Sequence, residues 1–161
     1  MVNKGFTILE VILAIFILSV AVFGSFSLIQ QTVVGVSLNQ SKLIAYYLAQ
    51  EGVEIVRNIR DTNWLQGSAW TAGLAVGEGN QEADYQSMVL ESYQGRYLRI
   101  GDNGFYNYAS GMETKFKRKI AVTEKSDGYL EVKVIIEWSE RGREHNIEVI
   151  NHLYNWKKTV I

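Results

Sequence analysis

Residues 5–29 read GFTILEVILAIFILSVAVFGSFSLI, and this stretch determines how the rest of the chain is organised. No charged residue occurs between Glu10 and Lys42. A helix needs about 20 apolar residues to cross a bilayer core of roughly 30 Å, and residues 11–29 supply that length. Lys4 precedes the apolar run, which favours an N-terminus on the cytoplasmic side. We therefore predict one transmembrane helix over about residues 11–29.

Three interpretations of the apolar run are open. A secretory signal peptide has a shorter apolar core, of about 7–15 residues, and a small-residue cleavage site. Residues 21–25 offer only a poor site of that kind. A plain signal anchor agrees with the length alone. The third interpretation depends on Glu10, because a carboxylate at the edge of an apolar span is costly and is usually functional or paired.

The helical pattern continues beyond the apolar run. Large aliphatic residues recur at the spacing of one helical face, at Ile44, Leu48, Ile55 and Ile59. The chain contains no proline, which permits a long uninterrupted helix. We expect one helix over residues 6–62, with an apolar first part and an amphipathic part at about residues 38–60.

Residues 63–161 are expected to form a globular head. Glycines punctuate residues 63–95 without a clean period, so this segment is predicted to connect the helix to a sheet. Residues 96–156 alternate in the manner of antiparallel strands, with a hairpin turn at residues 101–104 and longer strands at 114–124, 129–139 and 143–156. An antiparallel sheet with one apolar face needs a cover, and the amphipathic helix can supply it. The predicted fold class is α+β.

Two charged residues fall on the predicted inner faces. Glu51 lies between Leu48 and Ile55 on the apolar side of the helix, and Arg118 lies among the apolar residues of the first long strand. Because a buried carboxylate needs a partner, we predict that Glu51 and Arg118 pair, in a bidentate contact that would satisfy both groups. The alternative is that each side chain reaches solvent separately.

Composition excludes several classes of function. The chain has 161 residues, a net charge of −1 and no cysteine, which argues against a DNA-coating protein, a disulfide scaffold and thiol catalysis. The two histidines, His145 and His152, are seven residues apart and fall on opposite faces of a strand. No nucleotide-binding or hydrolase motif is present. We expect no enzymatic activity, no metal site and no cofactor.

The basic run at residues 115–119 raises the question of nucleic-acid binding. Lys115, Lys117 and Lys119 share one strand face and could contact phosphates. Lysines also commonly guard solvated sheet faces and edges against aggregation. We favour the second explanation, so a nucleic-acid partner is not expected.

The order Gly5-Phe6-Thr7-Ile8-Leu9-Glu10 directly before a long apolar helix resembles the prepilin cleavage motif of type IV pilins and pseudopilins. The C-terminal strands resemble the sheet of minor pilins of the pilus-modification type. Many major pilins carry proline at the position that Ser27 occupies, so its absence favours a minor pilin or a pseudopilin. Residues 63–95 resemble nothing that we can name.

The resemblance implies how the chain is processed, where it is located and what it assembles with. Residues 1–5 would be a leader that the prepilin peptidase removes after Gly5, and Phe6 would become the N-methylated terminus. Glu10 would pair with the terminal amine of a neighbouring subunit during filament assembly. The precursor would cross the bacterial cytoplasmic membrane once and would then join a cell-surface pilus or periplasmic pseudopilus. Its implied partners are the lipid bilayer before assembly, other pilin subunits, the prepilin peptidase and the inner-membrane assembly platform.

Two rival functions are compatible with the sequence. A pseudopilin of a type II secretion or competence (DNA uptake) system would share the whole N-terminal motif. A membrane-anchored extracytoplasmic binding module would share only the apolar helix and would keep an uncleaved N-terminus.

Overall fold

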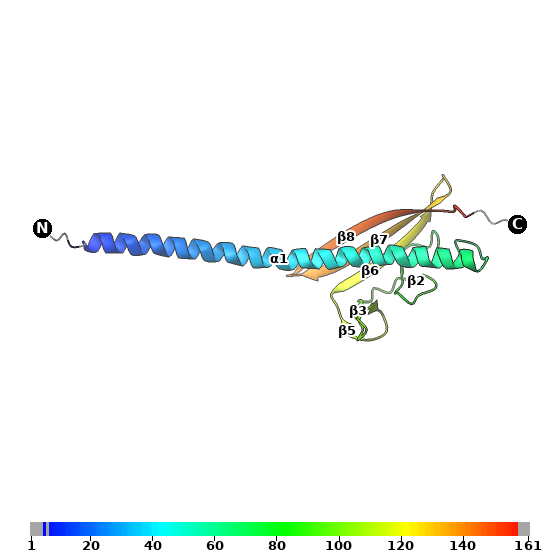
Figure 1. Ribbon diagram of the computed structural model, residues 1–161, viewed down its shortest axis with the longest axis horizontal. Helices are drawn as coiled ribbons and strands as arrows, with labels where there is room; N and C mark the ends of the chain where they lie inside the picture. Colours follow the sequence, from blue (N-terminus) through cyan, green and yellow to red (C-terminus); the bar gives the residue numbers. More distant parts are fainter. Residues whose placement is uncertain (1–4, 6, 158–161) are drawn as a thin grey trace. The chain divides into compact units, whose positions relative to one another are not determined.

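The computed structural model describes residue 5 and residues 7–157, and it consists of one long helix and a mainly antiparallel β head (Figure 1). Helix α1 spans Ile8–Leu65, whereas the sequence predicted residues 6–62. The α+β fold class is confirmed. The chain divides into two compact units, residues 1–41 and residues 42–161, and each unit is described by itself.

The first unit is helical and its apolar side chains are exposed. Within the described residues, α1 is the one helix that is long and apolar enough to cross a membrane, and it lies near the N-terminus. Hydroxyl groups in this unit bond back to the helix itself, among them Ser19 to Ile15 O at 2.7 Å, Ser25 to Ala21 O at 2.8 Å and Thr32 to Leu28 O at 2.9 Å. These bonds satisfy polar groups that an apolar environment would otherwise leave unpaired.

The head is built on a five-stranded antiparallel sheet in the order β2-β1-β6-β7-β8. Its strands are β1 (Gln81–Glu82), β2 (Glu91–Ser92), β6 (Phe116–Glu124), β7 (Tyr129–Glu140) and β8 (Arg143–Tyr154). The three long strands match the predicted ones to within two residues at each end. The turn between β6 and β7 has Gly128 at φ 75°, in the left-handed region that favours glycine.

The core lies between one face of this sheet and one face of α1. The inward residues of β7 are at most 2% exposed: Leu130, Val132, Val134, Ile136 and Trp138. The helix contributes Ala45, Leu48, Ala49, Val53, Ile55, Val56 and Ile59 to the same cluster. The alternation of β6 and β7 therefore predicted their buried face correctly, and the helical stripe supplies its cover.

The segment expected to connect helix and sheet also contributes strands. β1 and β2 lie within residues 63–95, and β1 pairs with β6 at Gln81↔Ile120, so the sheet begins before the predicted residue 96. Two-residue strands are too short to produce a readable alternation. A separate three-stranded sheet has the order β4-β3-β5, formed by β3 (Arg99–Ile100), β4 (Tyr106–Asn107) and β5 (Met112–Glu113). The β3–β4 pair is the predicted hairpin at residues 101–104.

Gly52 marks the closest approach of α1 to the sheet. A Cβ atom at this position would lie 2.8 Å from Val134 Cγ1 and 3.1 Å from Arg118 Cδ. Real Cβ atoms do not approach other atoms so closely, so any side chain at position 52 would push the helix away from β6 and β7.

This close approach predicts that Gly52→Ala destabilises the head. Overpacking lowers the free energy of unfolding by about 1–3 kcal/mol, and the better helix propensity of alanine offsets about 1 kcal/mol of this loss. We expect a net loss of up to about 2 kcal/mol in the free energy of unfolding, measured by denaturant titration of the detergent-solubilised chain. Gly35→Ala is the matched control, because nothing lies within 4 Å of a Cβ there. Equal stability of the two variants would contradict the proposed contact.

Candidate functional site

The N-terminal candidate site lies at the start of α1. Gly5 is exposed and precedes the helix, and Glu10 is exposed in its first turn. Phe6, predicted as the processed terminus, lies outside the described residues. The carboxylate of Glu10 therefore sits at the positive end of the helix dipole, where a negative charge is favourable.

Thr7 is the N-cap of α1. Its Oγ1 accepts a hydrogen bond from Glu10 N at 3.3 Å, and its carbonyl accepts the first intrahelical bond from Val11 N at 3.2 Å. Thr7 and Glu10 thus occupy the first and last positions of a Thr-x-x-Glu capping box. Helix capping is a second role for this segment, which we did not predict although the motif is readable in the sequence.

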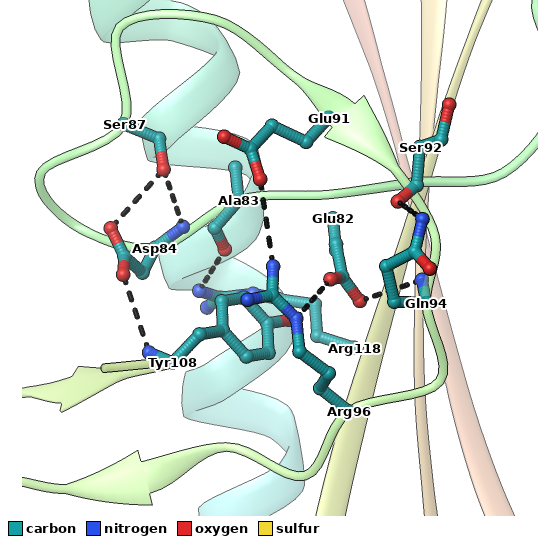
Figure 2. A network of polar contacts seen from close by, with 10 residues as sticks. All are labelled: Glu82, Ala83, Asp84, Ser87, Glu91, Ser92, Gln94, Arg96, Tyr108 and Arg118. Carbon is teal, nitrogen blue, oxygen red and sulfur yellow. Dashed lines mark hydrogen bonds and ion pairs between the residues drawn. The ribbon is translucent and has the colours of Figure 1, made fainter. Parts of the chain in front are cut away.

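The second candidate site is centred on Arg118 of β6, which is 0% exposed inside the head. Arg118 Nη1 lies 3.5 Å from Glu51 Oε2 and donates a hydrogen bond to Leu48 O at 3.2 Å. Nη2 donates to Ala83 O at 2.6 Å, as Figure 2 shows. The structure therefore brings the predicted pair together, with Arg118 linking the helix, β6 and the residue that follows β1.

The geometry of this pair is not the bidentate contact that we predicted. Only one oxygen of Glu51 faces the guanidinium group, and both Glu51 Oε1 and Arg118 Nε are buried without a hydrogen-bond partner. Two of the guanidinium donors go to backbone carbonyls instead. This preference has a physical reason, because Ala83 O is itself buried in the head and needs a donor.

Burial raises the pKa values of two side chains near Arg118, Glu51 and Tyr108. Desolvation raises the pKa of its carboxyl above the usual value, and the nearby Arg118 guanidinium counteracts this only in part. Tyr108, on the loop beside Arg118, has a buried hydroxyl without a partner, and burial raises its pKa to about 12. Both shifts have burial as their largest cause.

A second arginine organises the neighbouring surface (Figure 2). Arg96 Nε lies 2.6 Å from Glu82 Oε1, and its guanidinium group stacks 4.6 Å from the ring centre of Tyr108. Glu82, whose side chain is 0% exposed, also accepts a hydrogen bond from Gln94 N at 3.2 Å. Asp84 accepts hydrogen bonds from Tyr108 N at 3.3 Å and from Ser87 Oγ at 3.1 Å. Charge pairing of this kind fixes the loops to the sheet.

Sequence reasoning missed this second network. Glu82 and Arg96 are separated by 14 positions in a glycine-punctuated segment with no periodicity. No pattern in such a segment distinguishes a buried glutamate from a solvated one. The absence of basic residues between Asp61 and Gly95 was the one available signal, since it leaves Arg96 as the first cation able to neutralise the acids there.

The three lysines of the basic run, one directly before β6 and two within it, contact acidic or aromatic side chains of the head. Lys115 Nζ lies 2.9 Å from Glu140, Lys119 Nζ lies 2.6 Å from Glu137, and Lys117 Nζ lies 4.4 Å from the ring centre of Tyr97. Nucleic-acid binding was not expected from the sequence.

The two histidines sit on opposite faces of β8, as predicted. His145 stacks on Trp138 and His152 packs beside Tyr129. Among the residues that the structure describes, no group of three or more His, Cys, Asp or Glu side chains could hold a metal ion.

Comparison with protein-family models, with curated proteins and with solved structures gives no significant match to this chain.

We predict that Arg118 and Glu51 are energetically coupled. Arg118→Met removes the donors to Leu48 O and Ala83 O and leaves the Glu51 carboxylate unpaired, so it should cost about 3 kcal/mol or more of stability. Glu51→Gln should cost far less, because the carboxylate is already disfavoured by burial. Denaturant unfolding of both single variants and the double variant would give the coupling energy. If Glu51→Gln has the same effect in both backgrounds, the ion pair contributes nothing.

The pKa of Glu51 predicts a pH dependence of stability. A carboxyl whose pKa is raised on folding binds more protons in the folded state, so its contribution falls as the pH rises above the ordinary value of about 4.5. Wild type should therefore lose stability relative to Glu51→Gln as the pH increases through the raised pKa. Thermal unfolding of both proteins between pH 4 and pH 8 tests this. A difference that stays constant with pH would show that Glu51 has an ordinary pKa.

Proposed function

We propose that this chain is a minor type IV pilin, a structural subunit of a pilus or pseudopilus. The observation that carries the proposal is the sequence from Gly5 to Glu10 placed at the very start of a long helix whose apolar side chains are exposed. In this proposal the prepilin peptidase cuts after Gly5, Phe6 is methylated, and the helix leaves the membrane to enter the filament. The role is structural rather than catalytic.

The exposure of the apolar helix supports this proposal. Ile12, Phe16 and Phe23 are each at least 60% exposed, and large apolar side chains continue to Val36. A helix that is apolar all round must be covered by lipid or by other helices. A bundle of identical or related helices offers the same apolar surroundings as a bilayer, so one helix can serve in both.

Glu10 gives the proposal a mechanism. Its carboxylate is exposed at the N-terminal end of α1. After cleavage, the terminal amine of a neighbouring subunit could pair with it, and such a pair is strongly favoured over two separate charges in apolar surroundings. One carboxylate at a fixed position would then set the axial register of each entering subunit.

Two other functions share parts of this support. A pseudopilin of a type II secretion or competence system would use the same cleavage and the same Glu10 contact. A membrane-anchored extracytoplasmic binding module would need only the apolar helix and the head. In every case the expected starting location is the bacterial cytoplasmic membrane, with one crossing; a pilin or pseudopilin would then move to the cell surface or the periplasm.

The proposal predicts peptidase-dependent processing. Co-expression with a prepilin peptidase should give a chain that begins at Phe6 and carries about 14 Da for one methyl group, as read by intact-mass and peptide mass spectrometry. Without the peptidase the chain should begin at Met1. An intact terminus in both cultures, or a cut near Gly24, would favour the anchored binding module instead.

A pair of variants separates assembly from helix capping. Glu10→Gln should still be cleaved but should be lost from sheared filaments, because the amide cannot neutralise a terminal amine. Thr7→Ala weakens the N-cap by about 1 kcal/mol but leaves the carboxylate in place, so it should still assemble. If both variants assemble equally well, the role of Glu10 is capping alone.

A further inference from the structure

A small polar pocket lies in the head, at the three-stranded sheet β4-β3-β5. Figure 1 shows β3 and β5 in a lobe that stands apart from the long strands of the main sheet. The pocket has a volume of about 330 Å³, at the lower end of the range for small-molecule sites. The lobe contributes six lining residues, Gly101, Asp102, Asn103, Asn107, Ala109 and Ser110. The loop after β1 contributes the other two, Tyr85 and Gln86.

Hydrogen bonds fix the polar side chains of this pocket. Asn107 is only 8% exposed, and its Oδ1 accepts hydrogen bonds at 2.8 Å from the backbone N–H groups of residues 109–110. Asn103 Oδ1 accepts one from Phe105 N at 3.1 Å, and Asn103 Nδ2 donates to Tyr85 Oη at 3.1 Å. Because these bonds already hold the side chains in place, a ligand would not have to order them on binding.

Several hydrogen-bonding groups of the pocket remain available to a ligand. Tyr85 Oη accepts from Asn103 Nδ2 and from Gln86 Nε2, the latter at 2.9 Å, so both of its lone pairs are used while its own hydrogen is available. The amide of Asn107 makes one long bond of 3.4 Å to a backbone carbonyl and keeps a second N–H. The carboxylate of Asp102 is exposed, and no cation among the described residues pairs with it. The pocket therefore offers donors and an acceptor together.

Gly101 leaves space beside these amides. A Cβ atom at this position would lie 2.9 Å from Asn103 Oδ1 and 3.2 Å from Asn107 Nδ2, which is closer than side chains normally pack. The φ angle of Gly101 is not in the left-handed region, so the backbone conformation does not require glycine there. Glycine is instead the residue that keeps the space next to the two amides open.

The lining disfavours most classes of small ligand. None of the eight lining residues is basic and one is acidic, so an anion would meet repulsion and no counter-charge. One carboxylate is too few for a metal ion, and no group of three or more His, Cys, Asp or Glu side chains in the described part of the chain could hold one. A purely apolar ligand would leave the amides unpaired. The lining therefore fits a neutral ligand whose groups both donate and accept hydrogen bonds, as the hydroxyl groups of a sugar do.

An exposed aromatic ring lies next to the polar lining. Phe105 stacks on Tyr85 with ring centres 4.9 Å apart, and it is 55% exposed. A sugar ring presents C–H groups on one face, and an aromatic side chain offers a flat apolar surface on which that face can pack. A polar pocket with an aromatic ring beside it matches both kinds of surface that a sugar presents.

We propose that this pocket binds a neutral sugar, as a single pyranose unit or as the end of a glycan chain. Hydroxyl groups of the sugar donate to the Asp102 carboxylate and accept from Tyr85 Oη and Asn107 Nδ2. The C–H face of the sugar packs on Phe105. The site lies wholly within residues 42–161, so this inference goes beyond the pilin proposal and does not depend on it.

The test uses the full chain in nanodiscs of phosphatidylcholine, because many detergents carry sugar head groups. The probes are the methyl α- and β-pyranosides of glucose, galactose and mannose. Titration by saturation-transfer NMR gives their dissociation constants, with empty nanodiscs as the control. We expect at least one of these glycosides to bind, and the lack of binding by all of them would overturn the proposal.

Two variants locate the sugar. Tyr85→Phe keeps the ring that stacks on Phe105 but removes the hydroxyl donor, so it should weaken binding by about three- to tenfold, the usual effect of one hydrogen bond. Tyr97→Phe is the matched control, because this tyrosine is 41% exposed and does not line the pocket. Gly101→Ala fills the space beside the amides and should weaken binding as well. Unchanged binding in both Tyr85→Phe and Gly101→Ala would place the sugar elsewhere and overturn the proposal.

A charged analogue tests the preference for a neutral ligand. The uronic acid that matches the best glycoside should bind more weakly, because its carboxylate is repelled by Asp102. Asp102→Asn should reduce this difference, whereas Asp127→Asn, in the exposed turn between β6 and β7, should leave it unchanged. Equal binding of the uronic acid and the neutral glycoside to the wild-type chain would contradict the assignment to a neutral sugar.

Discussion

The head depends on the contact between one face of α1 and the inner face of β6 and β7. Neither element can bury its apolar residues alone, because the sheet has a single apolar face and the helix a single stripe. Gly52 allows the two backbones to approach closely, and the residues around it are almost fully excluded from solvent. The chain has no cysteine, so this packing stabilises the head without the disulfides that many small secreted domains contain.

A fully buried arginine, Arg118, lies in the middle of that contact. Removing an arginine from water is costly, and a buried ion pair is often no more stable than an apolar pair of the same shape. Arg118 contributes by contacting several segments at once. It donates hydrogen bonds to Leu48 O of the helix and to Ala83 O after β1, and it forms an ion pair with Glu51. An apolar residue would fill the same volume but would permit these segments to slide against one another. Arg118 instead specifies one arrangement.

Sequence patterns predicted the structure correctly where a helix or strand is long enough to show several periods and buries one face. Alternation in β6 and β7 located their inner residues, and this alternation together with the helical stripe predicted that Arg118 faces Glu51. Side-chain geometry was not accessible in this way, because the competition between Glu51 and two backbone carbonyls for one guanidinium group is decided by three-dimensional packing. The strands β1 and β2, and the Glu82–Arg96 pair beside them, belong to a segment where turns follow each other too quickly for any period to develop.

The hydroxyl groups of Ser19, Ser25 and Thr32 bond to carbonyls of their own helix. These side chains therefore need no hydrogen-bond partner from lipid or from a neighbouring helix. If the helix passes from lipid to a protein bundle, these three hydrogen bonds remain intact. Around these side chains, only the van der Waals contacts change. These three hydrogen bonds therefore favour neither lipid nor a bundle of helices as the surroundings of α1.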